Sequence, residues 1–460
     1  MTRHLIIGGG PAAINAIETI RDFDGASAIT LVCDEPAYAR MALPYYLAQR
    51  VPRGHMFTAD DAYYDQLKVE RQIGKRVQKV DPKAKQVTLD DSKTLAFDNL
   101  LIATGSSATI PPIPGADLPG VYPLWTLAHA DAVLKATANT PKPEVVFVGA
   151  GFIGFIVLNA MYKRGWKLHV VEIAKQVLPR MLDPDSARMV KAWLGSKGVG
   201  LHLGTTVKSI ADASGRKRLT LANGTTIDAD LVIVATGIRP NLDLVQGSGI
   251  ATDQGILVND RMQTNFANIY AAGDVAQGPD LLGDKPAVHP IQPTAVDHGR
   301  IAGANMAGKE THYPGSLQIN ILDVCGLQCS SFGRWGESTE AMTIANPDRP
   351  VYRKLLWTGD QISGAVFAGQ ATDMGLLNDV GMVKGIIQTR AALGAWKEYL
   401  RANPFDIRRA YVATKVAAQL AKTTLLGRPS RARQYRFGNR QPTPQVTRPD
   451  AHQVFVGTKE

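Results

Sequence analysis

The sequence has little cysteine and no long apolar run. Its 460 residues include three cysteines, Cys33, Cys325 and Cys329. Three thiols cannot build a disulfide framework, and an ordinary iron–sulfur cluster needs about four thiolates. No apolar stretch approaches the ~20 residues that span a bilayer, and Leu5–Ile7 is far too short for a signal-peptide core. We therefore expect a cytoplasmic protein without a membrane span, which needs a cofactor if it transfers electrons.

Most of the excess positive charge lies near the C-terminus. The chain carries a net charge of +10, and the residues from Lys422 to Glu460 contribute eight basic and two acidic side chains to it. The rest of the chain is close to neutral, so its charge does not predict a nucleic-acid partner.

The first residues read as a strand, a glycine turn and a helix. Gly8, Gly10 and Ala13 satisfy the G-x-G-x-x-G/A dinucleotide-binding pattern. The first glycine makes a tight turn, the second lets the backbone approach a pyrophosphate, and the small third residue packs the helix on the strand. Glu35 follows Ala13 by 22 residues, close to the ~20 expected for the carboxylate that holds a ribose hydroxyl.

The same design recurs at Gly149, Gly151 and Gly154, with Glu172 placed 18 residues after Gly154. Each copy also contains a later strand that runs into Ala-Thr-Gly, at residues 103–105 and 235–237. A lone glycine turn is a weak signal because such turns often only connect strands. Two copies with matched acids and matched tripeptides favour two dinucleotide-binding units.

Between each glycine turn and its tripeptide, apolar residues alternate with polar ones at a period of two. This pattern predicts a small meander of strands laid over each parallel sheet. A third signature, Gly273-Asp274, follows the second unit.

With these five motifs in order, the chain resembles the two-dinucleotide-binding flavoproteins over about residues 1–390. That superfamily includes disulfide reductases, ferredoxin and rubredoxin reductases, and nitrite-reductase flavin domains. The resemblance implies FAD in the first unit, NAD(H) in an inserted second unit, and a return of the chain to the FAD domain.

The resemblance also implies which residues bind the cofactors. The residues implied for FAD are Gly8, Gly10, Pro11, Ala13, Glu35, Arg40, Tyr45, Val77, Ala103, Thr104, Gly105, Gly273, Asp274, Pro293, Thr294 and Ala295. Those implied for NAD are Gly149, Gly151, Phe152, Ile153, Gly154, Glu172 and Gly237. Arg40 could instead form an exposed salt bridge. No catalytic side chain and no metal site is expected, because the flavin carries the chemistry.

The expected fold class is α/β, with two Rossmann-like dinucleotide-binding domains, a small α+β C-terminal domain, a helical extension and a basic tail. We expect the FAD domain at 1–112 and 244–312, the NAD domain at 113–243 and an interface domain at 313–390. We expect one helix around 380–390, at the end of the interface domain, and another around 408–420. The extension would cover 391–427 and the tail 428–460. Apolar residues of the extension, such as Leu400 and Val416, could be core or could face a partner.

Two departures from the family pattern bear on mechanism. Met41 stands where coenzyme A disulfide reductases and NADH oxidases carry a catalytic cysteine, and a thioether cannot form a thiolate. Ile156 stands where the family usually has glutamate after the second glycine turn, so we interpret it as packing. Cys325 and Cys329 are interpreted as packed small residues rather than a redox pair.

These features are most similar to the FAD/NAD(H) subunits of multi-subunit anaerobic oxidoreductases, such as phenylglyoxylate dehydrogenase and tungsten aldehyde oxidoreductase. The implied function is electron transfer between an iron–sulfur subunit or ferredoxin-like carrier and NAD⁺ through FAD, within an oligomeric complex. One alternative is a free-standing rubredoxin, ferredoxin or nitrite-type reductase that uses NADH. The non-enzyme alternative is a flavin-bearing protein that senses NADH or assists assembly.

The basic tail supports three hypotheses. Five arginines lie between Arg428 and Arg440 without an acid, and Tyr435 and Phe437 are interleaved with them. Such a segment could dock a partner, could be an inert arm, or could bind RNA. The RNA hypothesis is the weakest because the rest of the chain resembles a complete redox enzyme.

Overall fold

A computed structural model describes residues 1–336, 340–346 and 349–424. The chain divides into two compact parts, Met1–Ala417 and Ala418–Glu460. Except for the last residues of helix α11 (Val416–Thr424), the elements below belong to the larger part. The expected tail, 428–460, lies outside the described residues.

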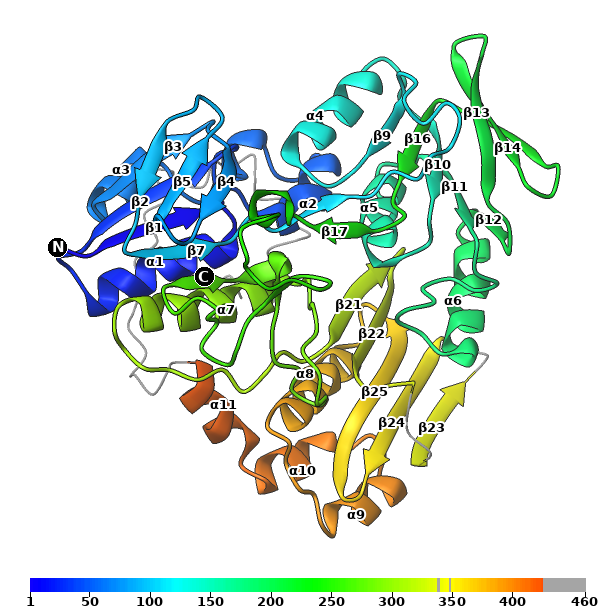
Figure 1. Cartoon of the computed structure of the whole chain (residues 1–460). Helices are drawn as coiled ribbons and strands as arrows, with labels where there is room; N and C mark the ends of the chain where they lie inside the picture. The colour runs from blue at the N-terminus through cyan, green and yellow to red at the C-terminus, as the bar shows by residue number, and fades with distance from the viewer. Residues whose placement is uncertain (337–339, 347–348, 425–460) are drawn as a thin grey trace, which may run out of the picture. The chain divides into compact units, whose positions relative to one another are not determined.

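The first sheet is parallel and has the strand order β19-β7-β1-β2-β3 (Figure 1). Its strands are β1 (Arg3–Ile7), β2 (Ala28–Cys33), β3 (Val69–Ile73), β7 (Asn99–Ile102) and β19 (Ile269–Ala271). Strand β19 comes from far along the chain, after the whole second sheet. The chain therefore returns to its first sheet.

The second sheet repeats the first, with the order β12-β11-β10-β16-β9 and parallel pairing throughout. Its strands are β9 (Val121–Pro123), β10 (Glu144–Val148), β11 (Lys167–Glu172), β12 (Gly200–Leu203) and β16 (Leu231–Val234). β10 leads into the second glycine turn as β1 leads into the first. The expected fold class, with two Rossmann-type units, is confirmed.

An antiparallel three-stranded meander accompanies each parallel sheet, as the alternation predicts. The meander strands are β4 (Val77–Asp81), β5 (Gln86–Leu89), β6 (Thr94–Ala96), β13 (Val207–Ala213), β14 (Arg216–Leu221) and β15 (Thr226–Ala229). Val80 and Val87 pack in one core with Leu5 and Leu100 of the first sheet. Val77 belongs to the same core and is 7% exposed, so its side chain serves packing.

Two short strand pairs complete the dinucleotide-binding region. β8 (Ser106–Ala108) pairs antiparallel with β17 (Ile238–Pro240), and β18 (Ile256–Leu257) pairs parallel with β20 (Ala276–Gln277). The β8–β17 pair lies where the chain leaves the first sheet for the second and where it comes back.

Helices cover the sheets and are mostly short. They are α1 (Pro11–Phe23), α2 (Leu43–Leu47), α3 (Asp61–Gln66), α4 (Leu127–Ala136), α5 (Phe152–Tyr162), α6 (Pro184–Ser196) and α7 (Gln292–Met306). Single 3₁₀ turns occur at Arg40–Ala42, Arg53–His55, Asp243–Val245 and Gly273–Val275. Within the described ranges, no helix has both the length and the apolar composition needed to cross a membrane.

Helices α1 and α7 are separated by more than 250 residues of chain yet lie side by side (Figure 1). Gly299 makes this contact possible, because a Cβ on it would lie 2.2 Å from the carbonyl oxygen of Ala12. Gly303, one turn later, would place a Cβ 2.6 Å from the carbonyl oxygen of Ala16. The two backbones are therefore in direct contact, and the first turn of α7 is fixed relative to the first turn of α1.

The C-terminal domain is an antiparallel sheet of order β21-β22-β25-β24-β23 with helices beside it. Its strands are β21 (Ile319–Val324), β22 (Leu327–Gly333), β23 (Glu340–Asn346), β24 (Val351–Thr358) and β25 (Gln361–Gln370). Its helices are α8 (Met374–Gln388), α9 (Trp396–Ala402), α10 (Ile407–Ala413) and then α11.

Both expected C-terminal helices need correction. The first begins at Met374 rather than near 380, because the Asp373 side chain caps it by accepting a hydrogen bond from the Leu376 N–H. The second divides into α10 and α11 at Lys415, whose φ is +55°. Leu400 and Val416 are fully buried, so they are core residues.

The α1–α7 contact predicts that Gly299→Ala destabilises the protein by about 1–3 kcal/mol, because the added methyl must separate two backbones. The matched control is Gly381→Ala on α8, where a Cβ meets nothing within 4 Å. That change should stabilise the protein by up to about 1 kcal/mol through helix propensity. Urea denaturation followed by circular dichroism measures both. Equal stability of the two variants would contradict the tight contact.

Candidate functional site

The two glycine turns have the same backbone geometry. Gly8 and Gly149 both have φ of +106°, a conformation that side chains rarely adopt. A Cβ on Gly8 would lie 2.2 Å from the carbonyl oxygen of Ala103, and one on Gly149 would lie 2.5 Å from that of Ala235. Each turn therefore packs directly on the backbone of the Ala-Thr-Gly segment that follows a strand of the same sheet, β7 or β16. Only glycine fits there.

The second glycine of each turn faces open space instead. Gly10 and Gly151 precede the first residues of α1 and α5, and a Cβ on either would meet nothing within 4 Å. The first N–H groups of a helix have no partner inside it, and the helix dipole favours negative charge at that end. An open, amide-rich helix start fits a dinucleotide pyrophosphate.

The third position packs helix against strand, as the pattern predicts. Ala13 is fully buried. A Cβ on Gly154 would lie 3.0 Å from the carbonyl oxygen of Gly149 and 3.4 Å from the Cβ of Ala235. A larger residue at either place would push the helix start away from the turn.

Glu35 and Arg40 form an ion pair near the end of β2, with 2.9 Å between Oε1 and the guanidinium nitrogen. The Arg40 guanidinium also lies over the rings of Trp125, at 5.0 Å, and Tyr38, at 5.7 Å. Burial raises the pKa of Glu35, and the charge of Arg40 opposes that rise. Arg40 therefore forms a salt bridge that is only partly exposed, and its contact with FAD stays a prediction.

Asp274 lies where three distant segments meet. A Cβ on Gly273 would lie 3.3 Å from Ala12 at the start of α1 and 3.5 Å from Ala295 at the start of α7. The Ser106 hydroxyl donates a 2.7 Å hydrogen bond to Asp274 Oδ2. Burial raises the pKa of the Asp274 carboxyl, with Ser106 and Arg40 opposing. A hydrogen-bond donor beside this carboxylate would offset the cost of burying its charge.

Two side chains that sequence reasoning missed organise this region. The Trp125 indole N–H donates to the carbonyl oxygen of Ser106 at 2.6 Å, so one residue links Arg40 to the Ser106–Asp274 pair. Asn241 bonds the 103–105 turn: its Nδ2 donates to the Thr104 carbonyl at 2.8 Å and its N–H donates to the Gly105 carbonyl at 3.0 Å. Their only sequence signal is position: Trp125 lies just after β9 and Asn241 just after β17, and only the fold brings them to residues 104–106.

The start of α7 is the second helix terminus in this region. Gln292 and Pro293 are exposed, whereas Thr294 and Ala295 are buried. The helix is 15 residues long and its first turn carries no acidic residue, so its N-terminal dipole is uncompensated by its own side chains. This end of α7 suits a group that gains negative charge.

No thiol is exposed at the position where related enzymes use cysteine. Met41 and Tyr45 are 54% and 56% exposed there. Cys33, Cys325 and Cys329 are free and buried, and burial raises the pKa of the Cys33 and Cys325 thiols to about 12. Thiolate chemistry is therefore suppressed at all three cysteines.

In the second dinucleotide-binding unit, Glu172 is only 9% exposed, and its carboxylate accepts hydrogen bonds from the backbone. Its Oε2 accepts from the Ala150 N–H inside the glycine turn at 2.6 Å, and its Oε1 accepts from the Ala174 N–H at 2.9 Å. A carboxylate has about four lone-pair sites, so acceptors remain for a ribose hydroxyl. The ribose contact stays a prediction, and the structure adds that Glu172 fixes the turn.

A cavity of about 570 Å³ opens directly after Glu172, lined by Lys175 and Gln176 from the second unit and by Trp335 and Lys354 from the C-terminal domain. It lies at the carboxyl end of β11, where α/β sheets bind ligands.

The remaining residues predicted for the second dinucleotide site have these positions. Phe152 and Ile153 begin α5, and Ile156 packs partly buried against the core, as interpreted. Gly237 has φ of +141°. Among the described residues, no group of three or more His, Cys, Asp or Glu could hold a metal ion.

Most of this chain is similar in sequence to known proteins. The family model for pyridine nucleotide-disulphide oxidoreductases matches residues 2–299. The chain is 31% identical over 417 residues to the epsilon subunit of NADH-dependent phenylglyoxylate dehydrogenase from Aromatoleum evansii, covering 89% of this chain and 96% of that protein. It is 32% identical over 341 residues to NADH oxidase from Methanocaldococcus jannaschii, covering 72% and 76%.

The solved structure of a NAD-dependent persulfide reductase from A. fulgidus is also similar, with a TM-score of 0.78 and 27% identity over 85% of this chain and 78% of that one. Proteins of this family bind FAD and NAD(P)H. The chain therefore belongs to the pyridine nucleotide-disulphide oxidoreductase family and is an NAD(P)H-dependent flavin oxidoreductase.

Proposed function

We propose that this chain is the FAD-bearing NAD(H) oxidoreductase subunit of a multi-subunit oxidoreductase that oxidises 2-oxoacids or aldehydes. In such a complex it would pass electrons between an iron–sulfur partner and NAD⁺. The observation that carries this proposal is the similarity to the phenylglyoxylate dehydrogenase epsilon subunit, which extends over 89% of this chain and 96% of that subunit. The thiol-free position at Met41 supports it, because it leaves the flavin without a cysteine partner.

In this proposal the first unit holds FAD between α1, the Gly273-Asp274 turn and α7. When bound, FAD accepts one or two electrons, whereas nicotinamide exchanges hydride only. The open start of α1 at Gly10 would hold the pyrophosphate and Glu35 the ribose, while Asp274 would accept from a cofactor hydroxyl. The start of α7, with Pro293 and Thr294, would stabilise negative charge on the reduced ring.

The second unit would hold NADH by the same physical means. The start of α5, with Gly151 and Phe152, would hold the pyrophosphate, and Glu172 would accept from the adenosine ribose. Because Glu172 is already fixed by two backbone N–H groups, it offers its remaining lone pairs in one orientation. Its charge would repel a 2′-phosphate, which favours NADH over NADPH.

The iron–sulfur cluster must come from a partner in this proposal. The whole sequence contains three cysteines, whereas an ordinary cluster needs about four thiolates. All three cysteines are also buried. Free, buried thiols are also typical of a reducing compartment, which supports a cytoplasmic location.

The open space at Gly10 predicts that Gly10→Val abolishes FAD binding without unfolding the protein, because the side chain enters the volume proposed for the pyrophosphate. Gly151→Val is the matched control in the second unit. It should keep FAD but lose NADH-dependent bleaching of the flavin. Flavin absorbance after purification and stopped-flow reduction by NADH measure the two effects. A flavin-loaded Gly10→Val protein would disprove the first assignment.

The geometry of Glu172 predicts the effect of removing its charge. In Glu172→Gln, one amide oxygen can still accept from the turn, but the negative charge that opposes a 2′-phosphate is gone. We expect the NADH-over-NADPH preference in kcat/KM to fall about tenfold, with FAD content unchanged. Lys175→Gln, in the same loop, should not lower this preference. If the unaltered protein uses NADPH as efficiently as NADH, the proposed role of Glu172 is wrong.

The subunit proposal is tested by purifying the tagged chain under native conditions from the organism that makes it. We expect a complex that contains FAD and iron in addition to this chain, by native mass spectrometry and elemental analysis. NADH should reduce the flavin and then the iron–sulfur centres, and absorbance spectra measure both reductions. A chain that purifies alone, without iron, and that reduces small acceptors at full rate would contradict the proposal and favour a free-standing reductase.

A further inference from the structure

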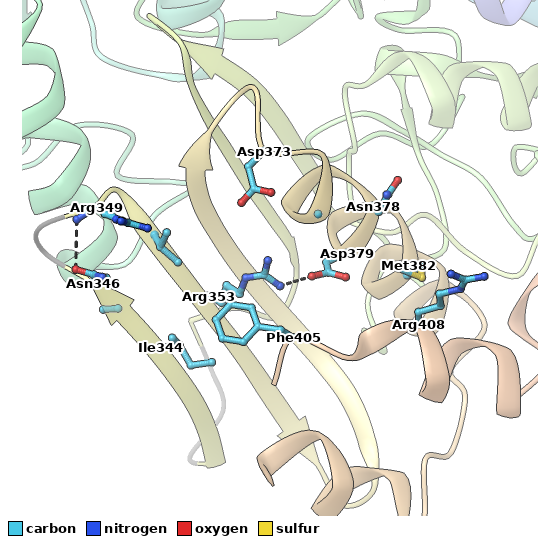
Figure 2. Close-up of a pocket in the computed structure, with 13 residues that line it drawn as sticks. Ile344, Asn346, Arg349, Arg353, Asp373, Asn378, Asp379, Met382, Phe405 and Arg408 are labelled. Carbon is cyan, nitrogen blue, oxygen red and sulfur yellow. Dashed lines mark hydrogen bonds and ion pairs between the residues drawn. The ribbon is translucent and has the colours of Figure 1, made fainter. Parts of the chain in front are cut away.

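A cavity in the C-terminal domain takes no part in the proposed electron transfer. It has a volume of about 790 Å³ and lies between strands β23 and β24 and helices α8 and α10 (Figure 2). None of its lining residues belongs to the glycine turns or to the start of α7. Its volume is in the range of small-molecule sites in proteins.

The charged base of this cavity is the side chain of Arg353. It is 5% exposed, and its guanidinium donates to the carboxylate of Asp379, which is also buried. The Nε–H of Arg353 has no acceptor among the described residues. That atom is buried, so a ligand in the cavity meets the charge of this guanidinium rather than its N–H group.

An aromatic ring covers this base. The Phe405 ring lies over the Arg353 guanidinium, with 4.5 Å between the guanidinium carbon and the ring centroid. Phe405 is nevertheless 57% exposed, so its other surface is available. Ile344, Val351 and Met382 add apolar surface to the same cavity.

The rim of the cavity is positively charged. Arg349 and Arg408 are exposed, and neither forms an ion pair with another described residue. Figure 2 shows them on either side of the Arg353–Asp379 pair. Two carboxylates also face the cavity: Asp379 is paired with Arg353, and the exposed Asp373 accepts from the Leu376 N–H at the start of α8. Three arginines against two aspartates leave the lining with a small positive charge, which favours an anion.

From these features we propose that the cavity binds a small organic carboxylate with an apolar or aromatic body. The carboxylate pairs with the rim arginines, and the charge of the buried Arg353 guanidinium adds to their attraction. The apolar body lies against Phe405 and Met382. This inference is independent of the proposed subunit function, because it uses no residue of the dinucleotide sites.

The experiment is isothermal titration of the FAD-loaded full chain with benzoate, and with benzamide as its neutral isostere. Inorganic phosphate tests for charge without an apolar body, and a tetraglutamate peptide tests whether a polypeptide carboxylate is the preferred source. Benzoate should bind at one site, and benzamide and phosphate should bind at least about tenfold more weakly.

The variants locate the site. Arg408→Ala and Phe405→Ala should each weaken benzoate binding about tenfold or more. Arg409→Ala is the matched control, because Arg409 is the next residue on the same helix but pairs with Asp406 and does not line the cavity. It should change binding less than about twofold. All three variants should keep normal flavin reduction by NADH.

Several results would overturn the inference. They are absence of benzoate binding, equal binding of benzamide, or equal loss in Arg408→Ala and Arg409→Ala. Binding of tetraglutamate alone would also overturn it and would assign the cavity to docking of an acidic polypeptide.

Discussion

The candidate flavin site depends on how closely backbones approach one another. At Gly8 and at Gly299, an added Cβ would lie 2.2 Å from a carbonyl oxygen of a segment far away in sequence. These contacts bring the starts of α1 and α7 to the Gly273-Asp274 turn. Two helix N-termini and one carboxylate are thereby brought to one place by backbone contact. Such contacts hold atoms in place because packed interiors yield little to small displacements.

The sequence predicts those parts of the site that depend on local backbone conformation. Gly8, Gly10 and Ala13 have distinct roles in a short strand–turn–helix, and each role requires a small residue at a fixed spacing. The second copy at Gly149 repeats the φ angle of Gly8. The meanders could also be predicted, because alternation of apolar residues is a local property of strands.

The rest could not be predicted because it depends on pairing between distant segments. Trp125 contacts the site through its indole N–H and Asn241 through its side-chain amide, and no spacing rule connects them with residue 104 or 106. The second role of Glu172, as an acceptor for its own glycine turn, also needs the folded loop. The division at Lys415 lacks the glycine or proline that commonly marks the end of a helix.

The β8–β17 pair has a mechanical consequence. The chain passes between the two dinucleotide domains twice, and its two crossings are hydrogen-bonded to each other as an antiparallel ribbon. Asn241 fastens one end of this ribbon to the 103–105 turn. A paired ribbon resists sliding of one strand along the other but can bend and twist. A rotation about this ribbon would therefore break fewer of its hydrogen bonds than a shift of one crossing along the other.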